Sequence, residues 1–341
     1  MSNELRIAVL GVGMMGADHV ARLQSRIAGA RVAVINDYVT DRAEELAATI
    51  DGCRVVIDPI DAIADPEVDA VLLATPGPTH EKQLLACLEH AKPVLCEKPL
   101  TTDAATSLEV VKAEAALGKT LIQVGFMRRF DAEYVELKGL IDSGDLGRPL
   151  VVHCVHRNPS VPSHFDSAMV VKDSLVHEVD VTRFLLDEEI TSVQIIKPFP
   201  NSKAPEGLQD PQIAVFSTES GRHVDTEVFV TTGVAYEVRT EVVAELGSAI
   251  IGLDVGLVRK SKPGTWGGAI TPSFKERFGQ AYDVQIQRWV DAVLRGAESG
   301  NYVDGPGAWD GYAAAAVCEA GVSSLETGER VQVAMVDRSS I

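Results

Sequence analysis

The first third of the chain alternates short, almost wholly apolar runs with longer segments that mix apolar and polar residues. The apolar runs are rich in Val, Ile and Leu and occupy residues 6–11, 31–36, 69–75, 93–98 and 120–126. Strands that are buried on both faces have this composition, as they do in parallel sheets covered by helices. The segments between them are compatible with helices and occupy residues 17–27, 41–50, 79–91 and 103–118. The alternation predicts an α/β domain with a doubly wound parallel sheet.

The pattern changes from about residue 149. A strand at 149–157 and a helix at 172–186 are followed by segments with more polar alternation and more Thr and Glu, at residues 190–198, 212–217, 223–232, 236–245 and 249–254. This alternation is typical of a largely antiparallel sheet with one open face. Two further helices are expected at 274–296 and 307–326. We therefore expect a nucleotide-type domain over 1–126 and an α+β domain over 127–341.

A glycine motif, "GVGMMG", lies between the first predicted strand and the first predicted helix, with Gly11, Gly13 and Gly16 as its glycines. Such glycines permit a tight turn, the close approach of a pyrophosphate and tight packing of helix on strand. The positive end of the helix then faces the phosphate charge. The motif in this context predicts a Rossmann dinucleotide site, with Met14 and Met15 also at the cofactor.

Asp37 stands at the end of the second predicted strand, 21 residues after Gly16. A carboxylate at this position accepts hydrogen bonds from the adenine ribose hydroxyls and repels a 2′-phosphate, which favours NAD over NADP. The alternative interpretation is an acid that only caps the turn after its strand.

Other polar residues follow the strand ends on the side where nucleotides bind in such sheets. The stretches "LLATPGPTH" and "CEKPL" place Thr75, His80, Glu97 and Lys98 there, and we expect these residues at the cofactor crevice. Pro99 restricts the backbone of Lys98 and so limits where its amine can point. The alternative for Lys98 is a solvated loop lysine, the usual environment of this residue type.

A polar stripe runs along the helix predicted at 172–186. Asp173, His177 and Asp180 are spaced by four and three residues, so at roughly 100° per residue they share one face. A polar stripe in an otherwise apolar helix is expected to face a cleft or polar partners inside the fold. On spacing alone, Asp173 could equally be the N-cap, with His177 and Asp180 a satisfied core pair.

Composition narrows the class of partner. The 341 residues carry a formal net charge of −18, which argues against binding to nucleic acid or to anionic membrane surfaces. No stretch is long and apolar enough to span a bilayer, and no secretory signal is visible. The five cysteines are scattered without a CxxC pair, which indicates reduced thiols in a cytoplasmic protein and no zinc-type or other metal site.

The glycine motif, "EKP" after the fifth predicted strand and "DSLVHEVDV" together resemble the Gfo/Idh/MocA oxidoreductases over essentially the whole chain. Within that family, the stretches at 125–131, 235–247 and 276–293 resemble the inositol 2-dehydrogenases. The resemblance implies a Rossmann domain and an α/β domain built on a large open sheet, usually in a homotetramer joined through those sheets. It also implies NAD(P)-linked oxidation of a ring hydroxyl on a polyol or sugar. With the preference for NAD that Asp37 indicates, the leading hypothesis is NAD-dependent oxidation of a cyclic polyol, myo-inositol, to its 2-keto form.

The resemblance also implies roles for particular residues. It assigns catalysis to Lys98, Asp173 and His177. The pKa of a histidine ordinarily lies near working pH, so His177 suits the removal of the hydroxyl proton. We expect Asp173 to hold the imidazole and Lys98 to hydrogen-bond the reacting oxygen.

Three further positions match those near the substrate in inositol-type members of the family: Arg128, Asn158 and Tyr236. Arg128 could instead be a surface charge beside Arg129, and Tyr236 could simply pack in its domain. For Asp180 a structural role, as a partner of Arg183, is favoured.

Other functions remain open on the sequence. The same scaffold serves other sugar and polyol dehydrogenases, such as scyllo-inositol or aldose 1-dehydrogenases. A non-catalytic NAD-binding regulator, or an enzyme that uses transient oxidation by tightly held NAD to cleave glycosides, would share the fold. The presence of all three catalytic groups favours a dehydrogenase.

Overall fold

The computed structural model describes residues 4–252, 265–266, 268–269 and 271–341. Contacts divide the chain into two compact units. The first comprises Met1–Phe126, Tyr282–Ala315 and Asp337–Ile341, and the second comprises Met127–Ala281 and Ala316–Val336. The first unit therefore includes segments from the end of the chain, and each unit is considered separately below.

The sheet of the first unit is parallel throughout, and its strand order is β3-β2-β1-β4-β5-β6. Its strands are β1 Leu5–Leu10, β2 Ala30–Asn36, β3 Arg54–Val55, β4 Ala70–Leu73, β5 Val94–Cys96 and β6 Ile122–Val124. The predicted doubly wound parallel sheet is confirmed. The order changes direction between β1 and β4, where such sheets bind nucleotides at the carboxyl ends of the strands. The sequence pattern missed β3, because two residues are too short to form an apolar run.

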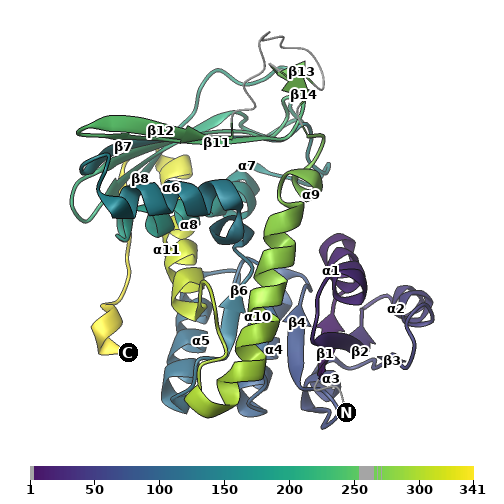
Figure 1. The fold of residues 1–341 in the computed structure, drawn as a ribbon. Coiled ribbons are helices and arrows are strands. Elements are labelled where there is room, and N and C mark those ends of the chain that lie inside the picture. Colours follow the sequence, from purple (N-terminus) through teal and green to yellow (C-terminus); the bar gives the residue numbers. More distant parts are fainter. Residues whose placement is uncertain (1–3, 253–264, 267, 270) are drawn as a thin grey trace. The chain divides into compact units, whose positions relative to one another are not determined.

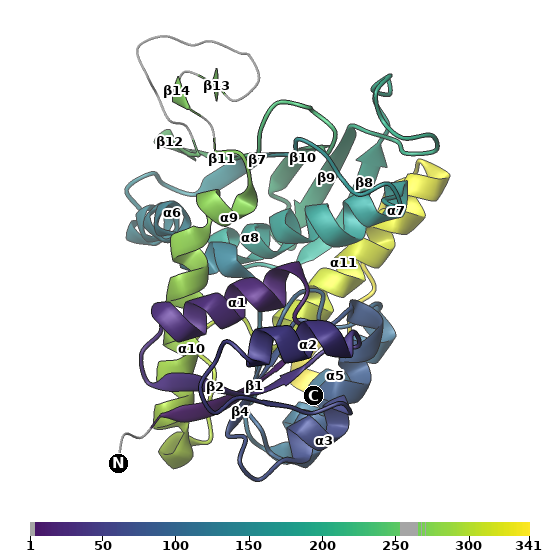
Figure 2. The ribbon, with the colours of Figure 1, turned by 90° about the vertical axis from the view of Figure 1, so that its right-hand side faces the viewer.

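Helices cover this sheet, and Figure 2 shows α1 and α2 in front of β1 and β2. The helices before residue 126 are α1 Met14–Ser25, α2 Thr40–Ala47, α3 Pro59–Ala64, α4 His80–Glu89 and α5 Ala104–Leu117. The sequence pattern missed α3, which has only six residues. Neighbouring residues nevertheless define where α3 begins. The side chain of Asp58 accepts a hydrogen bond from the backbone N–H of Ile60, and Pro59 occupies the first turn.

A late helix, α10 (Gly279–Ser299), completes the apolar core of the first unit. Ile286, Trp289, Val290 and Val293 belong to the same buried cluster as side chains of β1, β2, α1 and α2. Trp289 is fully buried. The N-terminal fold thus depends on residues that follow it by more than 150 positions.

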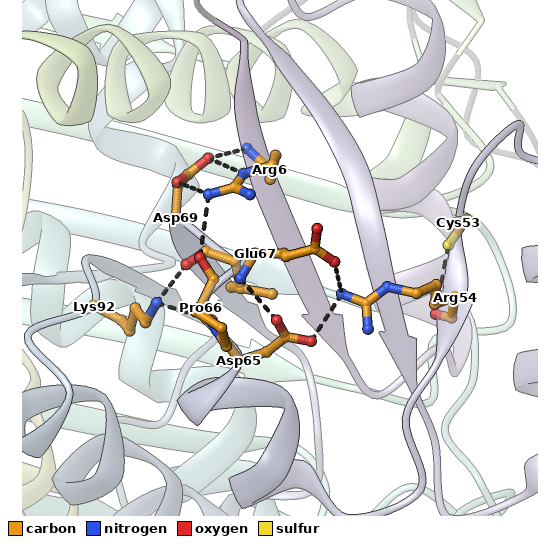
Figure 3. A network of polar contacts seen from close by, with 9 residues as sticks. Arg6, Cys53, Arg54, Asp65, Pro66, Glu67, Asp69 and Lys92 are labelled. Carbon is orange, nitrogen blue, oxygen red and sulfur yellow. Dashed lines mark hydrogen bonds and ion pairs between the residues drawn. The ribbon is translucent and has the colours of Figure 1, made fainter.

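A charged network lies where strands of the first unit begin (Figure 3). Asp69, just before β4, accepts hydrogen bonds from the backbone N–H of Arg6 and from its guanidinium, at 2.8–2.9 Å. The hydrogen bond from Arg6 lowers the pKa of Asp69, and burial lowers the pKa of Lys92, whose amine donates to the carbonyl of Asp65 at 3.1 Å. Because Arg6, Asp69 and Lys92 lie at the amino ends of strands, opposite the nucleotide edge, their pKa shifts reflect structural pairing.

The second unit contains a seven-stranded sheet in the order β12-β11-β7-β10-β9-β8-β15. Its strands are β7 Pro149–Arg157, β8 Ile190–Ile196, β9 Gln212–Thr218, β10 His223–Phe229, β11 Glu237–Ala244, β12 Gly247–Ile251 and β15 Val331–Gln332. Only β7 and β10 pair in parallel. The predicted α+β unit with a mainly antiparallel sheet is confirmed. Of the strand predicted at 249–254, residues 253 and 254 lie outside the described residues.

Helices lie along one face of this sheet, among them α6 (Ala132–Ser143), as Figure 1 shows for α6 and α8. The remaining elements are α7 Ser167–Met169, α8 Val176–Leu186, α9 Phe274–Arg277, α11 Ala308–Thr327, and a two-stranded pair of β13 Thr265–Trp266 with β14 Gly268–Ala269. α11 crosses the boundary between the units. The sequence pattern missed α6, and the helix predicted at 274–296 is divided after Arg277 into α9 and α10.

The helix that carries His177 begins earlier than the polar stripe indicated. α7 leads into a π-helical turn, Val170–Leu175, which continues into α8. The cap is Asp166, whose side chain accepts a hydrogen bond from the N–H of Met169 at 2.8 Å. Asp173 therefore lies inside the π-helical turn, and the alternative in which Asp173 is the N-cap was wrong.

The position of Trp289 gives a test of how much the late helix contributes. Trp289→Ala is expected to lower the free energy of unfolding by about 3–5 kcal/mol, because it leaves a large cavity in a sealed core. Ile57→Ala in the same unit, where the side chain is 75% exposed, should change it by less than about 0.5 kcal/mol. Urea unfolding measures both, and equal effects would contradict a core role for α10.

Candidate active site

Two of the three glycines of the loop, Gly11 and Gly16, occupy positions that only glycine fits. Gly11 has φ +82°, and a Cβ built there would lie 2.6 Å from the carbonyl oxygen of Ala74. A Cβ at Gly16 would lie 1.8 Å from the carbonyl oxygen of Gly11. Helix α1 begins directly after Gly13, whose lack of a side chain leaves the N–H groups of the first turn without a side-chain cap. These N–H groups and the open backbone fit the pyrophosphate of a dinucleotide.

Asp37 follows β2 directly and forms a hydrogen bond to the glycine loop. Its Oδ2 accepts a hydrogen bond from the N–H of Val12 at 2.7 Å, and its Oδ1 accepts one from the N–H of Val39 at 2.8 Å. The guanidinium of Arg42 lies 3.5 Å from Oδ2. Asp37 thus caps the following turn, as the alternative interpretation proposed, and also orients the glycine loop. Each carboxylate oxygen retains a lone pair that can accept from a ribose hydroxyl.

His80 and Thr75 hold backbone at the nucleotide edge. The two ring nitrogens of His80 lie 2.8 Å from the carbonyl oxygens of Thr75 and Pro99. The imidazole is 1% exposed. The hydroxyl of Thr75 donates to Oε1 of Gln83 at 2.7 Å. His80 therefore ties the end of β4 to the segment after β5.

Glu97 and Lys98 follow β5 directly, and both are half-buried. The N–H of Glu97 donates to the carbonyl of Leu73 at 2.8 Å, so that the segment stays beside β4. Oε1 of Glu97 lies 2.7 Å from Nε2 of His19, a residue of α1. Met14, in the first turn of α1, is 64% exposed. The first unit thus brings the glycine loop, Asp37 and the EKP segment to one edge of its sheet.

In the second unit, His177 lies among aromatic rings. His177 is 9% exposed, and Asp173, one turn earlier, is half-buried. The ring centroid of His156, from β7, lies 6.2 Å from that of His177 and 5.7 Å from that of Tyr236. Burial raises the pKa of Tyr236, which keeps its hydroxyl protonated. His156, a plausible cleft histidine on the sequence, thus lies next to both His177 and Tyr236.

A buried ionic group supports this cluster. Arg128 is 1% exposed, and its Nη1 donates to Oε1 of Glu178, the residue after His177. Nδ1 of His156 lies 3.1 Å from Oε2 of Glu178 and 3.3 Å from Nη2 of Arg128. Burial alone would raise the pKa of Glu178, but the neighbouring charges of Arg128 and His156 outweigh it and the pKa is lowered. The sequence-based assignment missed Glu178, although its place beside His177 in "VHEVD" was a usable signal.

Asn158 and Asp180 have different surroundings. Asn158 follows β7, and within the part of the chain that the structure describes its buried Oδ1 has no hydrogen-bond partner. A buried acceptor of this kind fits a polar ligand. Asp180 is 1% exposed and accepts hydrogen bonds from Arg129 at 2.6–3.1 Å. Asp180 thus has a structural partner, which is Arg129, while Arg183 pairs with Glu189.

The described residues were compared with the requirements of a metal site and of a membrane-spanning helix. In residues 4–252 and the later described segments, no group of three or more His, Cys, Asp or Glu side chains is placed to hold a metal ion. No helix of the described chain is long and apolar enough to cross a membrane.

Comparison with known proteins gives two family matches. Residues 5–126 match the model for the oxidoreductase family, NAD-binding Rossmann fold, and residues 138–333 match the C-terminal alpha/beta domain of the same family. The chain is 77% identical to an inositol 2-dehydrogenase of Rhodococcus erythropolis, over 100% of this chain and 98% of that protein. It is 76% identical to inositol 2-dehydrogenase 1 of Mycolicibacterium vanbaalenii, over 99% of each chain.

The fold is also close to a solved structure. Myo-inositol dehydrogenase from Lactobacillus casei, crystallised with NAD(H) and myo-inositol, superposes with a TM-score of 0.92 at 35% identity, over 98% of each chain. The predicted family and the predicted NAD cofactor are confirmed. The chain belongs to the Gfo/Idh/MocA family of NAD-binding oxidoreductases.

Proposed function

We propose that this oxidoreductase is an NAD-dependent inositol 2-dehydrogenase that oxidises a ring hydroxyl of myo-inositol to the ketone. The observation that carries the proposal is 77% identity to an inositol 2-dehydrogenase over the full chain. The L. casei structure, which contains NAD(H) and myo-inositol, supports it further. The substrate is a small neutral polyol, which suits a chain with a net charge of −18.

The cofactor is held by residues of the first unit. Gly11, Gly13 and Gly16 leave room for the pyrophosphate, and Asp37 accepts from the ribose hydroxyls. The remaining proposed contacts follow the strand ends or the start of α1 and comprise Met14, Met15, Thr75, His80, Glu97 and Lys98. Of these, His80 lies with its ring nitrogens 2.8 Å from the carbonyl oxygens of Thr75 and Pro99. Bound NAD supplies the hydride acceptor for the reaction.

Proton removal falls to His177. A neutral imidazole accepts the hydroxyl proton, and Asp173, four residues earlier on the same helical stretch, stabilises the imidazolium that forms. Lys98 donates a hydrogen bond to the reacting oxygen and favours its alkoxide character. The low exposure of His177 strengthens both electrostatic effects, because water screens them less.

Recognition of the remaining hydroxyls is assigned to Asn158 and Tyr236. Oδ1 of Asn158 can accept a hydrogen bond from a substrate hydroxyl, and the protonated hydroxyl of Tyr236 can donate one. Arg128 is the third proposed contact near the substrate, and its guanidinium also holds Glu178 and His156 in place. A pocket of such groups discriminates between epimers, because a misplaced hydroxyl leaves a buried polar group unsatisfied.

We also propose that the enzyme acts as a homotetramer in the cytoplasm. The alternation of buried and half-exposed residues along β9, β10 and β11 leaves one sheet face available for a second subunit. All five cysteines are free thiols, as is usual in a reducing compartment. Light scattering of the purified enzyme tests the assembly, and a monomeric mass would contradict it.

A panel of substrates tests the proposed reaction. NADH absorbance should appear with myo-inositol and NAD, and kcat/KM should be at least about tenfold lower with scyllo-inositol, glucose or xylose, since one unpaired buried polar group costs about that factor or more. NADP in place of NAD should be slower, because Asp37 repels its 2′-phosphate. A higher kcat/KM with another polyol would reassign the substrate, and no NADH with any polyol would contradict a net dehydrogenase.

The base is tested by His177→Ala. Loss of a positioned general base is expected to lower kcat with myo-inositol by about 10²–10⁴-fold at neutral pH. His90→Ala, which removes an exposed histidine at the end of α4, should leave kcat unchanged. Steady-state kinetics measures both, and near-normal turnover of His177→Ala would remove His177 from this role.

The buried ionic group predicts a pH-dependent change in stability. Arg128→Met leaves Glu178 ionised and buried without its strongest partner, at a cost of about 3–5 kcal/mol of unfolding free energy at pH 7. In the wild type the pKa of Glu178 lies below its ordinary value of 4.5, so its stabilisation is complete above that pH and is lost as pH falls through the lowered value. In the variant, burial instead raises the pKa, so protonation relieves the cost in acid.

The difference between wild type and Arg128→Met should therefore shrink as pH falls from 7 to below 4.5. Arg148→Met is the matched control, because the Arg148 side chain is 80% exposed beside Glu245, and it should leave the free energy of unfolding nearly unchanged. Chemical unfolding across this pH range gives the comparison. A pH-independent loss for Arg128→Met would show that packing, not charge pairing, accounts for it.

A further inference from the structure

Two buried histidines hold the segment that carries Lys98. His19, from α1, is 0% exposed and places Nε2 at 2.7 Å from Oε1 of Glu97. His80, from α4, is 1% exposed and places Nδ1 at 2.8 Å from the carbonyl oxygen of Pro99. Lys98 lies between these two contact points in the chain. The residues immediately before and after Lys98 are thus fixed from different helices.

We propose that His19 and His80 are positioning residues that set the orientation of Lys98 for the reaction. The proposal rests on the proposed function, in which the Lys98 amine donates to the reacting oxygen. A lysine carries several rotatable bonds, so a fixed backbone on both sides is needed before its amine can be held within catalytic tolerance.

Gly125 also lies close to Glu97. A Cβ at Gly125 would lie 3.0 Å from Oε2 of Glu97 and 3.1 Å from its Cα. The side chains of His19 and Glu97 are 1% and 13% exposed, so a hydrogen bond between them is little screened by water. The carboxylate of Glu97 therefore lies close to an imidazole and to a position that accepts only glycine without displacement.

The surroundings of the His19 ring leave Glu97 as its hydrogen-bond partner among the contacts of Nε2 and Nδ1. Among the described residues, its other ring nitrogen, Nδ1, has no hydrogen-bond partner. The imidazole packs edge-on against Tyr282 of α10, with ring centroids 5.7 Å apart. An N–H at Nε2 donates a hydrogen bond that the carboxylate of Glu97 can accept. A core histidine retained for packing alone would not need its one donor aimed at the residue before Lys98.

His80 makes the matching contact on the other side. Its second nitrogen, Nε2, lies 2.8 Å from the carbonyl oxygen of Thr75, at the end of β4. The Sγ of Cys96 lies 3.4 Å from Nδ1. The imidazole therefore connects the ends of two neighbouring strands through backbone groups. Its contacts hold Pro99 relative to β4 and so limit the movement of Lys98.

The test is a double-mutant cycle with Lys98→Met. His19→Leu removes the donor, and it should lower kcat with myo-inositol by about 10- to 100-fold, the value of one hydrogen bond to a charged group. The Kd for NAD, from fluorescence titration, should change by a smaller factor than kcat does. His19→Gln, which restores a donor near the Nε2 position, should recover most of kcat, and His90→Leu should match the wild type.

If His19 acts through Lys98, adding His19→Leu to Lys98→Met should cause no further loss of kcat. If the losses of kcat from His19→Leu and Lys98→Met multiplied in the double variant, the proposal would be overturned. His80→Gln in the same cycle should show the same lack of additivity. Gly125→Ala offers a second route should His19→Leu fail to fold, because its Cβ displaces Glu97 and should also lower kcat in a Lys98-dependent way.

A measurement that needs no substrate tests the positioning of Lys98 independently of the proposed reaction. Lysines of the wild-type protein can be reductively methylated with ¹³C-formaldehyde, and the Lys98 resonance assigned by its absence in Lys98→Met. His19→Leu should shift or broaden that resonance, and His90→Leu should not. If the wild type fails to oxidise any polyol but the resonance moves, the proposed function fails and the positioning stands. An unmoved resonance overturns the positioning.

Discussion

Helix α1 approaches its own glycine loop more closely than any side chain would allow, and the first unit depends on that contact. A Cβ at Gly16 would lie 1.8 Å from the carbonyl of Gly11. The N–H groups in the first turn of α1 have no side-chain cap, and they are the groups proposed to bind the pyrophosphate. The same helix carries His19 to Glu97 and Arg22 to Asp283 of α10. One packing constraint thus sets the cofactor loop, the EKP segment and the docking of the late helix.

The second unit relies on a different kind of constraint. Its candidate catalytic helix is buried on almost every side, so the polar residues that it carries need partners within the fold. Arg128 and His156 satisfy Glu178, and Arg129 satisfies Asp180. These pairs fix the rotation of the helix, and His177 lies beside His156, whose ring also packs against Tyr236. Glu178 and Asp180, the charged residues that follow His177, thus help to set the orientation of the helix that carries it.

Much of the fold could be predicted from local patterns, although some elements were missed. Strands β1, β2, β4, β5 and β6 were found because each is a continuous apolar run. β3 was missed because it has only two residues, and α6 was missed although it has twelve. The start of the His177 helix was misplaced because the cap, Asp166, lies outside the polar stripe that drew attention to the segment. The periodicity of apolar residues indicates which positions are buried. It contains little information about helix caps or about short strands at a sheet edge.

For the candidate site, the sequence by itself determined which residues could do chemistry. The glycine spacing and Asp37 follow from local geometry, since turns and strand ends involve residues a few positions apart. The roles of Lys98, Asp173 and His177 are instead what the resemblance to the family implies. Only the tertiary structure decided which long-range partners these residues acquire. The pairs His19–Glu97 and Arg128–Glu178 join residues 78 and 50 positions apart, and Trp289 enters the core of a sheet formed far earlier in the chain. Such contacts arise when separate elements bury their apolar faces together, a process that has no period along the chain and leaves no pattern in it.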